Sequence, residues 1–453
     1  MEGDKIGTTF SERGKRPLPK TLSVVKKEIH DSIARPDSTG LSHEESSLEC
    51  GLSVPVLHEA AFYGLAGEFV KALSPHTEAD PAAVLIHLLV VFGIAVGRGP
   101  HLIVDGARHG ANEFAVTVGA SSKARKGTAE ARTKETFLLA DPTFMERRVK
   151  GGLSSGEGLV YQVRDPVESF NQREGEWAIS DPGEEDKRLL AIEQEFGGVL
   201  RVIERDGNTL SAILRMAWDG SKLSPLTKGN RIEATDAHIG MIGHITKDEL
   251  LRRLKETEAA NGFGNRILWV YARRSKLLPE GGSFTGQAYF GEKLRLILDR
   301  VKGIGKMNRS ESFRRAWVQA YPVLTSGGAG LTGILTNRQE AHTLRLAMVF
   351  ALLDRSDTLD IQHLRAALSI TDYVRETVEW IFGKKLGDRT ADRILECLAG
   401  GPKTQTEIYL SFGKHESGAE IERAMKSLVD AGRVTSSVQK TAGRPRILWS
   451  LAV

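Results

Sequence analysis

Short apolar runs alternate with amphipathic stretches through the centre of the chain. Four of these runs predict buried strands, and each leads into polar or glycine-containing residues: 114–118, 189–192, 237–246 and 267–271. Strands that alternate with helices are typical of an α/β fold, and strands this apolar favour a mostly parallel sheet flanked by helices.

Changes in composition divide the rest of the chain. Residues 1–50 are polar and charged without sustained periodicity, and we interpret them as a disordered tail. We expect residues 51–285 to form the α/β core with N-terminal helices, and residues 286–387 a helical lid subdomain. Residues 388–453 have a different pattern and predict a separate C-terminal domain.

The longest apolar run, residues 82–96, is too short for an ordinary membrane span and predicts a buried helix. Of the 453 residues, 40% are hydrophobic and 26% charged, as in ordinary globular proteins, and the formal net charge is only +4. Affinity for nucleic acid must therefore come from local basic patches. With only Cys50 and Cys397 and no apolar signal segment, we expect a cytoplasmic protein without a membrane partner.

A loop from Gly119 to Thr128 joins the first strand to an amphipathic helix, with the sequence Gly-Ala-Ser-Ser-Lys-Ala-Arg-Lys-Gly-Thr. Strand, glycine-containing loop and helix is the layout of the phosphate-binding P-loop, G-x-x-x-x-G-K-[ST]. In that motif, backbone N–H groups and a lysine face the phosphates. Here the threonine lies two places after Lys126 instead of directly after it. The alternative is a basic turn before a surface helix.

Six residues of this loop are candidates for binding a nucleotide: Gly119, Ser122, Lys123, Lys126, Gly127 and Thr128. Lys126 is the better candidate for the phosphate lysine, and Lys123 is close enough to compete.

Acidic residues follow the second apolar run, in the sequence Arg-Leu-Leu-Ala-Ile-Glu193-Gln-Glu195. In P-loop enzymes one acid at such a strand end orients Mg²⁺ and another polarises the attacking water. A period of two places Glu193 and Glu195 on one face and Gln194 on the other. Acidic residues also end many surface strands, so this pattern alone does not identify a site.

Polar groups also mark the ends of the two remaining core strands. His244 and Thr246 end the third run, where either could sense a γ-phosphate or align water, and where His244 could equally be a structural histidine. Arg266 follows the turn Asn-Gly-Phe-Gly-Asn and precedes the fourth run. It is a candidate arginine finger for a neighbouring subunit, and the alternative is a structural ion pair with Glu256 or Glu258.

The C-terminal stretch predicts three helices followed by two short strands around a basic turn, which is a winged helix. Its third helix would enter the major groove of DNA, and the wing would contact phosphates. Five basic residues are candidate DNA contacts: Arg423, Lys426, Lys440, Arg444 and Arg446. A winged helix that contacts protein is the alternative.

The order of these parts resembles ATPases of mobile genetic elements and prophages, which are similar to RepA/DnaB-like and MCM-like AAA+ replicative helicases. Three stretches carry the resemblance, which covers roughly residues 55–453: Gly-Ala-Ser-Ser-Lys-Ala-Arg-Lys-Gly-Thr128, Asn-Gly-Phe-Gly-Asn-Arg266 and Arg-Arg-Ser-Lys-Leu-Leu-Pro279. It implies that Lys126 serves phosphate, that Thr128 and Glu193 serve Mg²⁺, and that Arg345 is a γ-phosphate sensor in the lid.

The expected function is an ATP- and Mg²⁺-dependent, helicase-like DNA motor or replication ATPase, assembled as a homo-oligomer such as a hexameric ring. One alternative is a non-enzymatic DNA-binding initiator or regulator with a degenerate nucleotide-binding fold. Another is an ATP switch in phage defence whose winged helix binds protein.

Overall fold

The computed structural model describes most of the chain beyond the first 52 residues. The described residues are 53–120, 124–172, 175–224, 232–328, 330–383, 388–413, 416–430, 432–439 and 446–452. Candidate residues Ser122, Lys123, Lys440 and Arg444 lie outside them, as does the proposed N-terminal tail.

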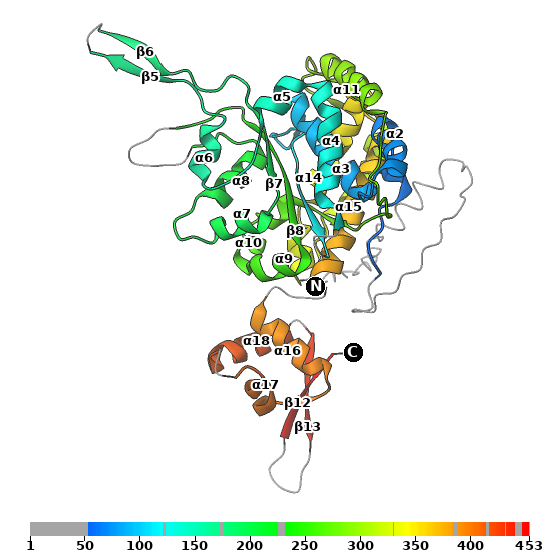
Figure 1. Ribbon diagram of the computed structural model, residues 1–453. Coiled ribbons are helices and arrows are strands. Elements are labelled where there is room, and N and C mark those ends of the chain that lie inside the picture. The colour runs from blue at the N-terminus through cyan, green and yellow to red at the C-terminus, as the bar shows by residue number, and fades with distance from the viewer. Residues whose placement is uncertain are drawn as a thin grey trace, which may run out of the picture.

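A five-stranded parallel sheet forms the centre of the molecule (Figure 1), with the strand order β4-β7-β8-β3-β9. Its strands are β4 (Val149–Lys150), β7 (Arg188–Glu193), β8 (His238–Thr246), β3 (Phe114–Gly119) and β9 (Ile267–Ala272). The prediction of an α/β fold with a mostly parallel sheet is therefore confirmed.

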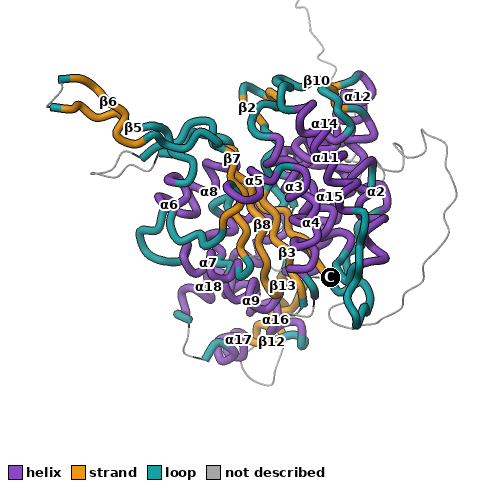
Figure 2. Tube along the Cα trace, turned by 45° about the horizontal axis from the view of Figure 1, so that its top comes forward, coloured by secondary structure: helices purple, strands orange, loops and turns teal. Residues whose placement is uncertain are grey.

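Alternate residues of each strand enter two different hydrophobic cores. In β3, Ala115 packs into the first core, whereas Phe114, Val116 and Val118 pack into the second. Both faces of the sheet are covered by helices, which explains why the strands are apolar on every side (Figure 2).

Long helices cover the first face: α3 (Pro81–Val96), α4 (Lys126–Ala140), α11 (Gln287–Val301), α14 (Gln339–Leu353) and α15 (Ile361–Phe382). Shorter helices cover the second: α6 (Gly156–Tyr161), α7 (Phe196–Ile203), α8 (Leu210–Asp219), α9 (Lys247–Arg253) and α10 (Glu256–Ala260). α2 (Gly64–Leu73), α5 (Pro142–Arg147) and α12 (Glu311–Leu324) extend the first core, and α13 (Gly330–Leu335) extends the second.

Helix α3 confirms the prediction of a buried helix at residues 82–96, because every residue from Ala82 to Val96 is buried. Asp80 accepts a hydrogen bond from the backbone N–H of Ala82 at 2.9 Å and so caps the helix. No helix in the described ranges has both the length and the apolar character needed to cross a membrane.

For residues 286–387 the sequence predicts a helical lid subdomain, and the described helices of this range share a hydrophobic core with the rest of the protein. Val349 of α14 and Leu364 of α15 belong to the same hydrophobic core as α3 and the sheet. Helix α14 is buried on all sides, with each residue from Ala341 to Leu353 buried. Because residues on every side of α14 are buried, the helix stays packed against its neighbours. These helices therefore form a layer of the core.

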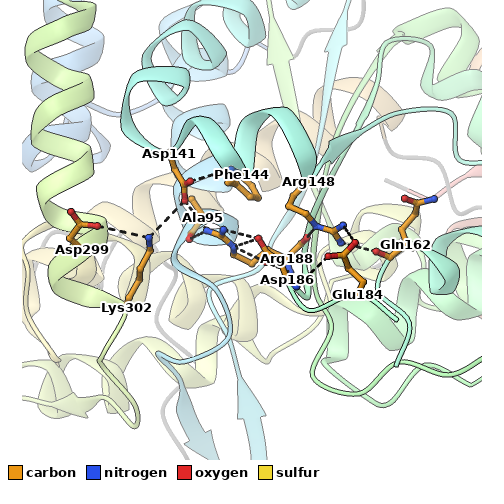
Figure 3. Close-up of polar contacts among 10 residues, drawn as sticks. All are labelled: Ala95, Asp141, Phe144, Arg148, Gln162, Glu184, Asp186, Arg188, Asp299 and Lys302. Atoms are coloured by element: carbon orange, nitrogen blue, oxygen red, sulfur yellow. Dashed lines mark hydrogen bonds and ion pairs between the residues drawn. The ribbon is translucent and has the colours of Figure 1, made fainter. Parts of the chain in front are cut away.

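An ion-pair network joins the amino end of β7 to the neighbouring helices (Figure 3). The guanidinium of Arg188 contacts Asp186 at 2.8 Å and Asp141 at 2.9 Å. Arg148 pairs with Glu184 at 2.9 Å and also donates to the carbonyl of Arg188 at 2.8 Å. The network holds the edge pair β4 and β7 to the end of α4.

Residues beyond 388 build a unit with its own hydrophobic core. It contains α16 (Arg389–Ala399), α17 (Gln405–Ser411), α18 (Gly418–Asp430), β12 (Lys403–Thr404), β13 (Val434–Gln439) and β14 (Arg446–Leu451). The three strands pair antiparallel in the order β12-β14-β13. The predicted three helices and two strands are present, with one further short strand.

Several small elements complete the structure. Strands β1 (Leu102–Val104) and β2 (Ala107–His109) form a hairpin, and β10 (Asn308–Arg309) pairs with β11 (Thr358–Leu359). A longer antiparallel hairpin, β5 (Val167–Asn171) with β6 (Glu176–Asp181), projects from the body of the molecule (Figure 1).

Candidate functional site

The strand order creates a crevice at the carboxyl ends of β3 and β8. From β3 the chain crosses to β4 at one edge of the sheet, whereas from β8 it crosses in the other direction to β9. Adjacent strands whose connections leave in opposite directions form a topological switch point, where ligands of open α/β sheets bind. Gly119 and Thr246 are register partners at this edge.

The loop after Gly119 enters α4 through a residue in a strained conformation. Arg125, the N-cap of α4, has φ 56° and ψ 32°, in the left-handed region that side chains other than glycine adopt at a cost of about 1 kcal/mol. Its guanidinium is 2.5 Å from the carboxylate of Glu78, which holds the residue in place. Strained backbone of this kind concentrates at ligand-binding sites.

Helix α4 begins at Lys126, so Lys126, Gly127 and Thr128 form its first turn. Partial burial lowers the pKa of the Lys126 ammonium. A methyl group added at Gly127 would lie 3.7 Å from Oε1 of Gln194, so this turn lies over the end of β7. The positive end of the helix dipole and Lys126 both favour an anion here.

Beneath this turn, three polar side chains lie side by side on three adjacent strands. Gln194 directly follows β7, His244 belongs to β8, and Thr117 of β3 is the register partner of His244. We call these three residues the polar row. Thr117 and His244 are buried, on the sheet face that packs on the first hydrophobic core.

Hydrogen bonds connect the polar row to the helices above it. The amide of Gln194 donates to Glu130 of α4, and its oxygen is 3.2 Å from Nδ1 of His244. Thr117 is 2.8 Å from Nε2 of His87 in α3, and the His87 ring stacks on the His244 ring with centroids 5.6 Å apart. Two helices and three strands therefore share one network, in which Gln194 is exposed and Glu130, His87, Thr117 and His244 are buried.

The hydrogen bonds determine the form of His244. Because the oxygen of Gln194 faces Nδ1, that nitrogen carries the proton and Nε2 is an acceptor. Burial and the charge of Lys126 lower the pKa of His244 to about 4, so the ring is neutral at physiological pH. Nε2 is buried and has no hydrogen-bond partner in the described part of the chain. A buried acceptor of this kind requires a donor from a ligand or water.

The candidate acids lie on the other side of β7. The buried carboxylate of Glu193 accepts a hydrogen bond from the backbone N–H of Leu153 at 2.8 Å. Leu153 lines a cavity of about 320 Å³ together with Gly151, Gly152 and Ser155. Glu195 is exposed at the N-cap of α7. The residue that faces α4 is Gln194, which the sequence reasoning set aside.

The predicted metal site at Thr128 and Glu193 stays a prediction. Within the described ranges, no group of three or more His, Cys, Asp or Glu side chains is arranged to hold a metal ion. Thr246 caps α9, because its hydroxyl accepts from the N–H of Glu249 at 3.3 Å. Of the two candidate sensors, His244 is therefore the one in the network of the polar row.

The arginine-finger role of Arg266 does not fit its position. Arg266 is buried, contacts Asp219 at 2.7 Å and donates to the carbonyl of Gly262 at 2.6 Å. It precedes β9, which places it at the amino edge of the sheet, opposite Gly119. The expected ion pair with Glu256 or Glu258 is replaced by the one with Asp219.

The sensor role of Arg345 likewise does not fit its position. Its guanidinium is buried, donates to the carbonyls of Asn112 at 2.7 Å and Trp218 at 2.9 Å, and stacks on the Trp218 ring at 3.7 Å. Asn112 precedes β3, so Arg345 also lies at the amino edge of the sheet. Both arginines are structural supports far along the strands from the crevice.

The sequence contained a signal for the position of Arg266. In a parallel sheet, a residue just before a strand lies at the opposite edge from a residue just after one. Arg266 precedes its strand, whereas Gly119, Gln194 and Thr246 follow or end theirs. Glu130, His87 and Thr117 had no comparable signal, because each is a polar residue within a helix or strand.

In the C-terminal unit, the described DNA-contact candidates are exposed. Arg423 and Lys426 lie on α18, and Arg446 begins β14. Helix α18 also carries Glu420, Glu422 and Asp430, so its three acids outnumber its two bases. Its surface is therefore less basic than expected for a helix that enters DNA.

Comparison with protein-family models gives no match, and comparison with curated protein sequences gives none.

Proposed function

We propose that the protein binds ATP at the crevice between β3 and β8 and hydrolyses it in a DNA-coupled, helicase-like reaction. The observation that carries this proposal is the unsatisfied buried acceptor on His244, directly beneath a strained strand–loop–helix segment at the switch point of the sheet. A polar network in a dry core is costly unless every group finds a partner, and a phosphate-bound water would provide one.

Each group has a distinct task in this proposal. The N–H groups at the start of α4 and the ammonium of Lys126 hold the phosphates. Gln194 and the neutral His244 orient the attacking water, because an amide and an imidazole acceptor fix its direction. Mg²⁺ would be held by Thr128 and would neutralise phosphate charge when bound.

ATP turnover with and without single-stranded DNA tests the proposal. Lys126→Ala removes the phosphate cation and should lower kcat/KM by about 100-fold or more, and Glu193→Gln tests the acid. Lys71→Ala, an exposed lysine on α2, is the matched control and should leave turnover unchanged. Normal turnover in both site variants would contradict the assignment of the site.

One observation favours a second function, a DNA-binding regulator that binds nucleotide without turnover. Glu193 is hydrogen-bonded on the face of β7 that points away from α4, so it is not aimed at the crevice. In that case nucleotide binds without hydrolysis, and DNA binding survives in Lys126→Ala.

We assign DNA contact to the C-terminal unit as a winged helix. The basic side chains at 440–446 would contact phosphates, because α18 is net acidic. Deleting residues 388–453 should abolish DNA affinity, and unchanged affinity would favour a unit that binds protein.

A further inference from the structure

The β5–β6 hairpin extends away from the body of the molecule and is fixed at its base (Figure 1). Arg164 forms a bidentate ion pair with Asp181, with hydrogen bonds of 2.6 Å and 2.8 Å. Asp181 also accepts from the backbone N–H of Gly183 at 2.8 Å. The base is therefore held in one orientation.

One face of the hairpin is apolar and exposed. Phe170 and Trp177 are cross-strand partners with ring centroids 5.9 Å apart, and Ile179 lies on the same face opposite Glu168. The exposed fractions are 51% for Phe170, 69% for Trp177 and 64% for Ile179. The opposite face carries small residues such as Ala178. We call the first face the aromatic face.

This arrangement is incomplete as it stands. An isolated two-stranded hairpin is marginally stable in water and needs a hydrophobic face packed on another element. Exposed aromatic clusters of this kind mark protein interaction sites. The described strands carry Glu168, Glu176 and Asp181 and neither lysine nor arginine, which disfavours contact with a nucleic-acid backbone.

Helix α12 of the same chain has a complementary surface. Its exposed side includes Arg314, Val318 and Tyr321, spaced four and three residues apart, together with Glu311, Arg315, Gln319 and Pro322. Val318 is 70% exposed and Tyr321 45% exposed. The apolar pair matches the aromatic face, and Arg314 matches its one charged residue, Glu168. Figure 2 shows the hairpin projecting from one side of the molecule and α12 lying across from it.

We propose that the aromatic face packs on α12 of a second copy of this chain. Two different surfaces then meet, so the contact is heterologous and repeats from copy to copy, closing a ring or extending a filament. Trp177 is the central anchor of the contact, because tryptophan dominates the binding energy of such interfaces. This contact does not require ATP hydrolysis.

Cross-linking between two single-cysteine proteins tests the contact directly. With Cys50 and Cys397 changed to serine, Trp177→Cys protein is mixed with Val318→Cys protein and treated with a short bismaleimide. The expected product is a dimer from the mixture and not from either protein alone. Ser180→Cys, on the opposite face of the hairpin, should give much less dimer with Val318→Cys.

Sedimentation velocity over a concentration series provides the second measurement. Trp177→Ser should raise the dissociation constant of self-association by roughly 30-fold or more. Ala178→Ser, on the small-residue face, is the control and should leave self-association unchanged. Circular dichroism of both variants verifies that the core is folded.

Three outcomes would overturn the proposal. They are a protein that stays monomeric at all concentrations, efficient cross-linking within Trp177→Cys alone, and equal dimer from Ser180→Cys and Trp177→Cys. The first points to another protein as the partner, and the second to a symmetric contact. Absence of ATP turnover in the parent protein, together with the expected self-association, would contradict only the proposed function.

Discussion

The rings of His87 and His244 stack 5.6 Å apart, although His87 belongs to the buried, strongly apolar helix α3 and His244 to the end of strand β8. Both are buried, and burial lowers the pKa of each. This pair of neutral imidazoles lies under the candidate phosphate loop and links helix α3 to the crevice. Because both rings must stay neutral in the folded protein, acid lowers the free energy of unfolding.

Protonation of His244 is predicted to lower the free energy of unfolding at acidic pH. The pKa of His244 falls from its ordinary 6.5 to about 4 on folding, so the unfolded chain takes up the proton first. Its stabilising contribution is complete above pH 6.5 and is lost as the pH falls toward 4, by about 2 kcal/mol between pH 7 and pH 5. His244→Asn keeps a donor for Gln194 and should remove this part of the loss. Urea unfolding at both pH values measures it, and an unchanged pH dependence would contradict the assignment.

Gln194 is predicted to stabilise the network through Glu130. Burial already raises the pKa of Glu130, and Gln194→Leu would remove its amide donor. We expect a loss of about 1–3 kcal/mol in the free energy of unfolding at pH 7. Glu195→Gln, at the neighbouring position, which is exposed as Gln194 is but makes no side-chain cap hydrogen bond, should change it by less than about 0.5 kcal/mol. Equal effects of the two substitutions in urea unfolding would show that the network is not stabilising.

A substitution at Gly127 is predicted to weaken nucleotide binding without affecting folding. An added methyl group meets Gln194 only at ordinary contact distance, so Gly127→Ala should fold with a melting temperature close to that of the parent. The same methyl group occupies the first turn of α4, where phosphate would approach the backbone. We expect nucleotide affinity to fall about tenfold or more, measured by fluorescent-nucleotide titration. Unchanged affinity would place the nucleotide elsewhere.

Arg345 is predicted to act in stability and not in catalysis. Arg345→Met leaves the carbonyls of Asn112 and Trp218 without their donor and should cost about 3 kcal/mol or more in the free energy of unfolding. Arg338→Met, at the half-buried N-cap of α14, is the control and should cost much less. A changed KM for ATP with unchanged stability would restore the sensor role.

Sequence patterns were sufficient for the elements and insufficient for the site. The apolar runs 114–118 and 82–96 correctly predict a buried strand and a buried helix, because an element that is buried on every side requires apolar residues throughout. The same principle applies to the helices of residues 286–387, which the sequence predicts to form a lid. An apolar helix such as α14 is the signature of a core layer, and its separation in sequence from β3 concealed their contact.

By itself, the sequence determined the strands, the buried helix α3 and the polar residues that end β7 and β8. Only the tertiary structure decided which of those residues meet. Side chains alternate along a strand, so Glu193, the last residue of β7, points toward Leu153, and the next residue, Gln194, points toward α4. Parallel strands also have two distinct edges, which places Arg266 and Arg345 at one edge and the loop after Gly119 at the other. Contacts of this kind depend on strand order, which local periodicity does not encode.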